Sequence, residues 1–218
     1  MGSFIDLSAA DGTRVPAYVA LPAGPARGAI VVLQEIFGVN SHIRAVADGY
    51  AQQGYVAVAP SAFHRVKAGV ELGYAEADMT AGMGLKAAVE ALPAPGVQQD
   101  IQAAIDHGAR VSGGKVGIVG YCWGGLLTWR AAALASGLSA AVPYYGGGMT
   151  SETEIARQPK VPVLAHFSDR DRWIPLEGVD AFRRAHPAVE VHIYPVRHGF
   201  NCGQRAAWDA DVARVVLE

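Results

Sequence analysis

The chain opens with a segment in which apolar and polar residues alternate. From Phe4 to Leu21 the alternation runs on both sides of an Ala-Asp-Gly-Thr turn, with Asp11 and Gly12 at its tip. Period-two alternation around an Asp-Gly pair is typical of a β-hairpin with one buried face. We therefore expect an antiparallel hairpin at the edge of a sheet.

Further along, short apolar runs alternate with longer segments of helical pattern. The runs are continuous, which is typical of strands buried on both faces in a parallel sheet. They lie at residues 28–34, 55–60, 115–120, 139–145, 161–167 and 189–194. The helical segments lie at about residues 42–53, 97–111, 123–136, 177–186 and 204–218. This alternation predicts an α/β fold with a mostly parallel central sheet, the N-terminal hairpin at its edge and helices on both faces.

Residues 61–96 depart from this rhythm, because they are longer than a simple connection and contain glycines and polar breaks. We interpret them as a partly helical excursion over the carboxyl ends of the strands that forms a lid or pocket wall. An ordinary long crossover is the alternative.

No repeat or linker interrupts the chain, so residues 1–218 are expected to form a single domain. The last helix reaches Glu218 without a capping residue, which is consistent with a chain that continues further.

Composition and charge indicate which kinds of molecule the chain binds. The chain has 218 residues, 51% of them apolar, and a formal net charge of −2, so it can bury one substantial core. Without a basic run it lacks the electrostatic footprint of a protein that binds nucleic acid or an anionic membrane. No apolar stretch reaches the roughly 20 residues of a membrane span, and the N-terminus has no signal-peptide pattern. These features predict a cytoplasmic protein that acts on small molecules.

Residues 116–125, Val-Gly-Ile-Val-Gly-Tyr-Cys-Trp-Gly-Gly, place a cysteine between a buried strand and a helix. Gly120 and Gly124 stand two positions either side of Cys122, where a side chain would collide with the neighbouring strand or helix. The pattern Gly-x-Cys-x-Gly matches the nucleophile elbow Gly-x-Ser-x-Gly, with sulfur in place of oxygen. A helix N-terminus and a nearby histidine would favour the thiolate. A cysteine buried as a small hydrophobic residue is the alternative.

A candidate base and a candidate acid follow the cysteine along the chain. His198 comes directly after the last apolar run, and Asp169 and Asp171 follow the run before it. We prefer Asp171 as the residue that orients the histidine, because it stands four residues before Pro175 in a turn that leads to the next helix. Asp169 is better placed to bond within that turn. The order nucleophile, acid, base is the one expected of an α/β-hydrolase.

Four segments of the chain resemble the dienelactone hydrolase family, also called carboxymethylenebutenolidase. They are Gln-Glu-Ile-Phe-Gly-Val-Asn at 34–40, Gly-Tyr-Cys-Trp-Gly-Gly at 120–125, Asp-Arg-Trp-Ile-Pro at 171–175 and His-Gly-Phe at 198–200. Together they extend over most of the chain. The resemblance implies a compact, monomeric α/β-hydrolase that needs no cofactor or metal. It also implies that Cys122, Asp171 and His198 form the catalytic triad.

The resemblance gives roles to three residues near the elbow. The carboxylate of Glu35 would hold the resting thiol and help to deprotonate it when substrate arrives. The backbone amides of Ile36 and Trp123 would form the oxyanion hole, one from the loop after an early strand and one from the residue after the nucleophile.

The differences from the family concern the substrate. Members that cleave dienelactone hold its carboxylate with two arginines, one in the excursion and one four residues past the catalytic histidine, where this chain has Cys202. Lys86 and Arg205 remain as candidate cations, although the helix predicted at 204–218 turns Arg205 away from the site. Candidate apolar contacts, which are core residues on the alternative interpretation, are Phe37, Phe200 and Tyr144.

We therefore expect a cysteine-dependent hydrolase that cleaves a small ester or lactone through an acyl-thioester. A thioesterase or an amidase is an alternative, because the elbow does not discriminate among acyl substrates. A redox-sensing or non-catalytic ligand-binding α/β-hydrolase fold is an alternative of another class, in which Cys202 would serve as a resolving thiol.

Overall fold

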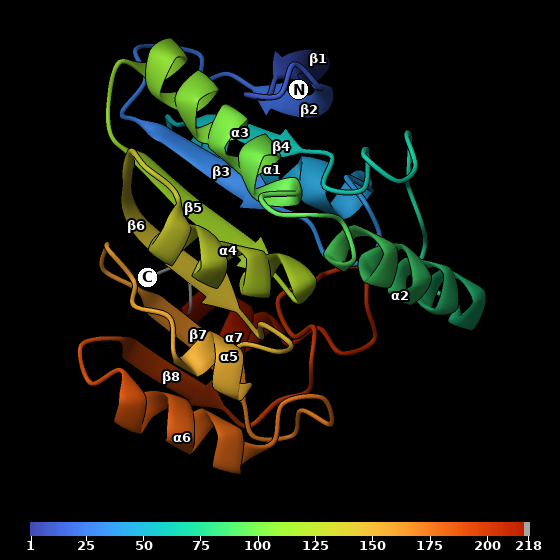
Figure 1. Ribbon diagram of the computed structural model, residues 1–218, viewed down its shortest axis with the longest axis vertical. Helices are drawn as coiled ribbons and strands as arrows, with labels where there is room; N and C mark the ends of the chain where they lie inside the picture. The colour runs from blue at the N-terminus through green and yellow to red at the C-terminus, as the bar shows by residue number, and fades with distance from the viewer. Residues whose placement is uncertain (216–218) are drawn as a thin grey trace.

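The computed structural model describes residues 1–215 and is built around one eight-stranded sheet (Figure 1). The strands are β1 (Ser3–Ser8), β2 (Arg14–Ala20), β3 (Ala29–Leu33), β4 (Val56–Pro60), β5 (Val116–Tyr121), β6 (Leu138–Tyr144), β7 (Leu164–Ser168) and β8 (Glu190–Tyr194). Their order in the sheet is β1-β2-β4-β3-β5-β6-β7-β8. The β1–β2 and β2–β4 pairs are antiparallel, and the other neighbouring pairs are parallel.

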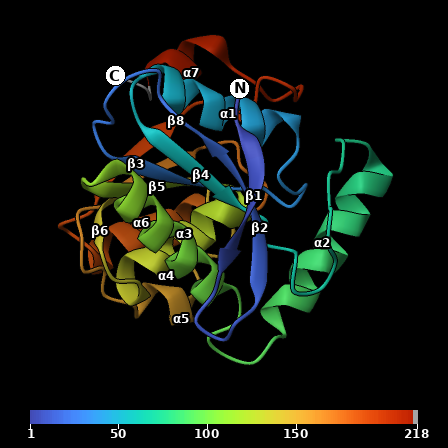
Figure 2. The ribbon, with the colours of Figure 1, turned by 90° about the horizontal axis from the view of Figure 1, so that it is seen from above.

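Helices cover both faces of this sheet. They are α1 (Ser41–Gln52), α2 (Glu76–Glu90), α3 (Val97–Ser112), α4 (Trp123–Leu134), α5 (Glu152–Ile155), α6 (Leu176–Ala185) and α7 (Ala210–Val215). Figure 2 shows α1 and α7 on one face and α3, α4 and α6 on the other. The predicted α/β fold class, with a mostly parallel sheet, is confirmed. Within residues 1–215 no helix combines the length and apolar character that crossing a bilayer requires.

The N-terminal hairpin forms as predicted. Its strands pair from Ser3 with Val19 to the turn, where Gly12 adopts a φ of 83° that costs glycine little. The carboxylate of Asp11 accepts a hydrogen bond from the backbone N–H of Thr13 at 3.0 Å, which stabilises the turn. Because β2 also pairs with β4, the hairpin extends one edge of the sheet.

The prediction that every apolar run is buried on both faces is wrong for residues 189–194. Each residue of β8 is at least partly exposed, since this strand forms the other edge of the sheet and has a neighbour on one side only. His192 and Glu190 pair at 2.7 Å on its exposed surface. The run is therefore apolar enough to form a strand without being part of the core.

The C-terminal helix is shorter than predicted. Residues 204–207 form turns and a bend, residues 208–209 have no regular structure, and α7 begins only at Ala210. The carboxylate of Asp209 accepts a hydrogen bond from the N–H of Val212 at 3.0 Å, which caps the first turn and fixes this start. The end of the predicted helix, residues 216–218, lies outside the described residues. The four residues of α5 were not predicted, because so short a helix shows no periodicity.

Residues 61–96 contain α2, which projects from the end of the sheet toward which β3 and β5 point (Figure 1). The loop before α2 is joined to the loop after β3, since the N–H of Leu72 donates to the carbonyl of Phe37 at 2.8 Å. Gly82 allows α2 itself to pack against that loop, because a Cβ at position 82 would collide with the carbonyl of Ile36. The excursion is thus packed beside the residues that follow β3.

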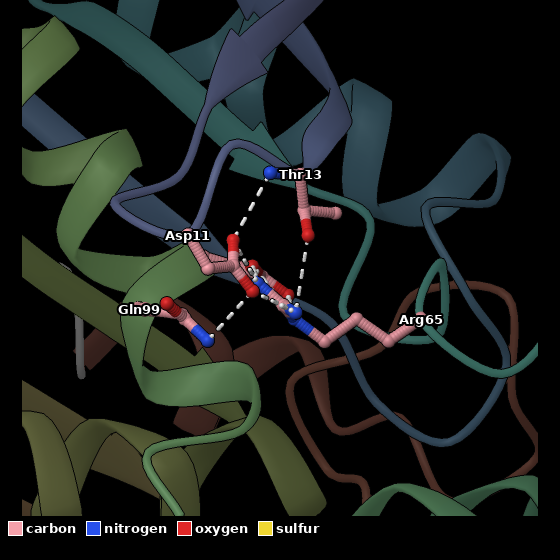
Figure 3. A network of polar contacts seen from close by, with 5 residues as sticks. Asp11, Thr13, Arg65 and Gln99 are labelled. Carbon is pink, nitrogen blue, oxygen red and sulfur yellow. Dashed lines mark hydrogen bonds and ion pairs between the residues drawn. The ribbon is translucent and has the colours of Figure 1, made fainter.

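Arg65, near the start of the excursion, joins three segments (Figure 3). Its guanidinium donates to both carboxylate oxygens of Asp100 on α3 at 2.6–3.0 Å and to Asp11 in the hairpin turn at 2.7 Å. The Gln99 amide also donates to Asp11, at 3.1 Å. The side chain of Asp100 is 1% exposed, and its burial raises the pKa of the carboxyl group. Arg65 therefore compensates a buried acid.

We expect Arg65→Ala to lower the free energy of unfolding by about 3 kcal/mol, because removing one partner leaves a buried charge uncompensated. Urea denaturation measures the change. Arg184→Ala, which removes an exposed arginine from α6, is the matched control and should change the stability by less than about 0.5 kcal/mol. Equal losses in the two variants would contradict the role given to Arg65.

Candidate active site

Cys122 occupies a sharp corner between β5 and α4, with φ 55° and ψ −117°. A residue other than glycine adopts such angles only where its surroundings hold it there. The N–H of Cys122 donates to the carbonyl of Tyr144 at 3.0 Å. A Cβ on Gly120 would strike the carbonyl of Gly124, and one on Gly124 would lie 2.5 Å from the carbonyl of Gln34. The two glycines thus permit the corner, which leaves the thiol half-buried.

Ile36 and Trp123 border the same cavity as Cys122. The N–H of Trp123 belongs to the first turn of α4, where amides have no acceptor within the helix. In the part of the chain that the structure describes, the N–H of Ile36 also donates to no protein acceptor. Amides with unused donors beside a sulfur atom can receive a developing oxyanion.

His198 and Asp171 come from loops after β8 and β7. The Nδ1 atom of His198 lies 2.6 Å from Oδ2 of Asp171, and the second oxygen of Asp171 accepts a hydrogen bond from the N–H of Trp173 at 2.8 Å. The two side chains are 10% and 0% exposed. Asp169, the alternative acid, is exposed and faces Arg170 at 3.8 Å. The acid that the structure brings to His198 is therefore Asp171.

The environment of His198 favours its protonated form. Burial of the ring opposes protonation, but the charge of Cys122 and the hydrogen bond to Asp171 outweigh it and raise the pKa of His198 to about 10. The imidazole is accordingly a cation at neutral pH. A cation beside a cysteine favours the thiolate, the nucleophilic form of sulfur.

The carboxylate of Glu35 is paired with Arg205, whose Nη1 lies 3.0 Å from Oε1. Within residues 1–215 no hydrogen bond joins Glu35 and Cys122, so the role expected of Glu35 at the thiol stays a prediction. A carboxylate that is 2% exposed requires a cationic partner. The expectation that a helix turns Arg205 away is wrong, because the helix begins only at Ala210. The guanidinium lies over the ring of Phe37 at 5.6 Å.

Glu35 belongs to one further cluster. Its carboxylate, a ring nitrogen of His42 and the thiol of Cys202 offer ligand atoms that all lie within 4.8 Å of one another. The thiol interacts with the hydroxyl of Tyr74 at 3.3 Å, and burial together with Glu35 raises the pKa of Cys202 to about 11. A cation here would have to displace Arg205 from Glu35 and a proton from Cys202. We therefore describe the cluster as packing.

A cavity of about 230 Å³ adjoins the thiol. Two of the proposed substrate contacts, Phe37 and Lys86, line it together with Arg205 and His198. Lys86 faces Glu90 at 3.9 Å along α2. Arg65, the arginine of the excursion, is paired with Asp11 and Asp100 and does not line this cavity. The cation that the excursion presents to this cavity is therefore a lysine, which lacks the planar fork of an arginine.

Two of the proposed substrate contacts are core residues instead. Phe200 and Tyr144 are 0% and 2% exposed, and neither lines the cavity. Tyr144 stacks on His166 at 4.5 Å, and Phe200 packs edge-on against Tyr145 at 5.1 Å. The alternative interpretation of these aromatics as core is correct, because both rings are buried against other aromatic rings.

Sequence reasoning missed three apolar residues that line the cavity. Met79 and Met83 stand one turn apart on α2, and Trp173 follows Asp171 in the loop after β7. Met83 and Trp173 are 45% and 54% exposed. The available signal was two methionines at i and i+4, a spacing that places side chains on the same face of a helix.

Comparison with solved structures gives the same fold. A crystal structure from Klebsiella pneumoniae, described as "Putative Dienelactone Hydrolase", superposes with a TM-score of 0.84 at 30% identity, covering 99% of this chain and 94% of the other. An esterase from Pyrococcus furiosus superposes with a TM-score of 0.66 at 13% identity, covering 91% and 84% of the two chains. The second likeness bears on the fold alone.

Comparison of sequences bears on the family as well as on the fold. A carboxymethylenebutenolidase from Pseudomonas putida is 30% identical over an alignment of 233 positions, which covers 98% of this chain and 92% of the relative. The model of the dienelactone hydrolase family matches residues 15–217. With its sheet order, its elbow and these matches, the chain belongs to the dienelactone hydrolase family of α/β-hydrolases.

Proposed function

We propose that this protein hydrolyses a small ester or lactone, with Cys122 as nucleophile and an acyl-thioester as intermediate. The observation that carries the proposal is the half-buried thiol on the strained corner after β5, beside a histidine that is hydrogen-bonded to a buried acid. In this arrangement Cys122, His198 and Asp171 have the roles of nucleophile, base and orienting acid.

Acylation begins when the Cys122 thiolate adds to the carbonyl carbon of the substrate. A carbon–sulfur bond forms, and the carbonyl electron pair moves to the oxygen. The N–H groups of Ile36 and Trp123 donate hydrogen bonds to the resulting oxyanion. Collapse of this intermediate breaks the carbon–oxygen bond, and the His198 imidazolium gives its proton to the departing alkoxide. The products of this step are an acyl-thioester and an alcohol, which stays attached to the acyl chain if the substrate is a lactone.

Deacylation reverses the use of His198. The ring, now neutral, takes a proton from the water that attacks the thioester carbonyl. The carbon–sulfur bond breaks, so that the carboxylic acid leaves and the thiolate and imidazolium are restored. Both steps use only residues of this chain and water. Asp171 positions the ring through its 2.6 Å bond to Nδ1, and Arg205 neutralises Glu35 near the sulfur.

The cavity supports a substrate with a small, largely apolar acyl group. Its volume of about 230 Å³ is below the usual range of sites for drug-sized ligands. Met79, Met83 and Phe37 supply apolar walls, and Lys86 supplies one cation. Both cysteines are free thiols, which suits a reducing compartment and supports a cytoplasmic location.

The proposal is tested by Asp171→Asn. The acid helps to raise the pKa of His198 to about 10, so a neutral amide lowers that pKa and the ring loses its positive charge at a lower pH. We expect alkylation of Cys122 by iodoacetamide at about pH 8 to slow by at least roughly tenfold, together with hydrolysis of a p-nitrophenyl ester. Asp169→Asn is the control and should leave both rates unchanged. An Asp171→Asn variant with the wild-type pH profile would contradict the proposed arrangement.

A further inference from the structure

A second cavity, of about 510 Å³, also adjoins His198. The two cavities share Trp173, His198 and Arg205. Cys122 lines only the first, together with Ile36 and Trp123. Among the residues that the structure describes, no acidic side chain lines the second. Its cationic side chains come from the loops after β7 and β8 and from the turns before α7; they are Arg170, Arg172, Arg197 and Arg205.

Half of this positive charge is not neutralised by an acidic side chain of the described residues. Arg205 is paired with Glu35 at 3.0 Å, and Arg170 faces Asp169 at the longer distance of 3.8 Å. Arg172 lies over the ring of Trp173 at 4.9 Å. In the described part of the chain, neither Arg172 nor Arg197 has an ion pair with an acid. Both are exposed and can therefore bind an anion that enters from solvent.

The chemistry of the site decides which part of a substrate reaches this cavity. The acyl carbon must lie against Cys122 and the amides of Ile36 and Trp123, which border the first cavity. The leaving group must lie at His198, since that ring protonates it. Because His198 borders both cavities, a leaving group held at that ring has access to the cavity of the arginines.

We propose that the second cavity is an anion-binding site for the leaving group, and that the preferred substrates are esters or thioesters whose alcohol or thiol carries a phosphate group. The proposal rests on the function proposed above and adds a substrate class to it. Guanidinium groups bind phosphate through paired hydrogen bonds. The half-exposed ring of Trp173 offers an apolar surface for the part of the leaving group between the ester and the phosphate.

The test compares three aryl acetates that differ only in the substituent on the leaving phenol: a phosphate, a carboxylate or a neutral methoxy group. We expect kcat/KM for the phosphate ester to exceed that for the neutral ester by at least roughly tenfold at low salt, and the ratio to fall as salt screens the arginines. In the double variant Arg172→Ala/Arg197→Ala the ratio should fall about tenfold. In Arg183→Ala/Arg184→Ala, which removes two exposed arginines of α6, it should not change.

Binding of phenyl phosphate, followed by calorimetry, gives a readout that does not depend on turnover. The wild-type protein should bind it and the Arg172→Ala/Arg197→Ala variant should bind it at least about tenfold more weakly. Equal kcat/KM for the three esters would overturn the inference while the proposed hydrolase stands. A preference for the carboxylate ester would replace phosphate by carboxylate and so overturn the stated class. Hydrolysis of none of the esters, without binding of phenyl phosphate, would overturn both proposals.

Discussion

Cys122→Ala should lose at least about 10⁴-fold in turnover of a small activated ester, because it removes the nucleophile that forms the acyl intermediate. The fold should survive the change. Alanine has to adopt the same positive φ as the cysteine, and the hydrogen bond from the backbone N–H of residue 122 to Tyr144 needs no side chain. Circular dichroism and urea denaturation report on the fold, and release of p-nitrophenol reports on turnover.

The matched control is Cys202→Ser. That thiol is buried and interacts with Tyr74 at 3.3 Å, so a serine can make the same contact without a nucleophilic sulfur. We expect this variant to keep most of the wild-type rate. If Cys122→Ala remained active and Cys202→Ser lost activity, the nucleophile would have to be assigned to the other cysteine.

His198→Ala should slow both acylation and deacylation, since the ring gives a proton in the first step and takes one in the second. General acid–base catalysis contributes typically 10² to 10⁴-fold, and we expect a loss of about that size in kcat/KM. Alkylation of Cys122 by iodoacetamide at neutral pH should slow as well, because the variant has no imidazolium beside the sulfur. Stopped-flow release of p-nitrophenol separates the first acylation from later turnovers.

His192→Ala is the control for this variant, because His192 lies on the exposed edge strand and pairs with Glu190 at 2.7 Å. Its rates should match those of the wild-type protein. A His198→Ala variant that is acylated at the wild-type rate would contradict the assignment of the base, even if later turnovers were slow.

Much of the fold could be predicted from the sequence because the apolar runs follow the strands closely. The glycines around Cys122 predicted the corner for a reason that the structure makes visible: a Cβ at either position would collide with a neighbouring carbonyl. Edge strand β8 shows the limit of this reasoning, since an apolar run does not indicate how many neighbours a strand has. The late start of α7 at Ala210 depends on a single cap, Asp209.

The candidate site could be predicted in part. The order of Cys122, Asp171 and His198 along the chain was visible, and the structure places His198 against Asp171. The path of residues 204–209 was not visible, so the pairing of Arg205 with Glu35 could not be foreseen. The second cavity was hidden for a different reason. Its arginines are 27 residues apart in sequence, at positions 170 and 197, and only the parallel pairing of β7 with β8 brings their loops together.

The most direct test of the central claim is mass spectrometry of the wild-type protein, quenched in acid during hydrolysis of p-nitrophenyl acetate. The account predicts one acetyl group on the peptide that contains Cys122. That adduct should protect the thiol from iodoacetamide and should decay at the rate of turnover. An acetyl group on another residue, or steady turnover while Cys122 stays unmodified and open to alkylation, would contradict the proposed acyl-thioester.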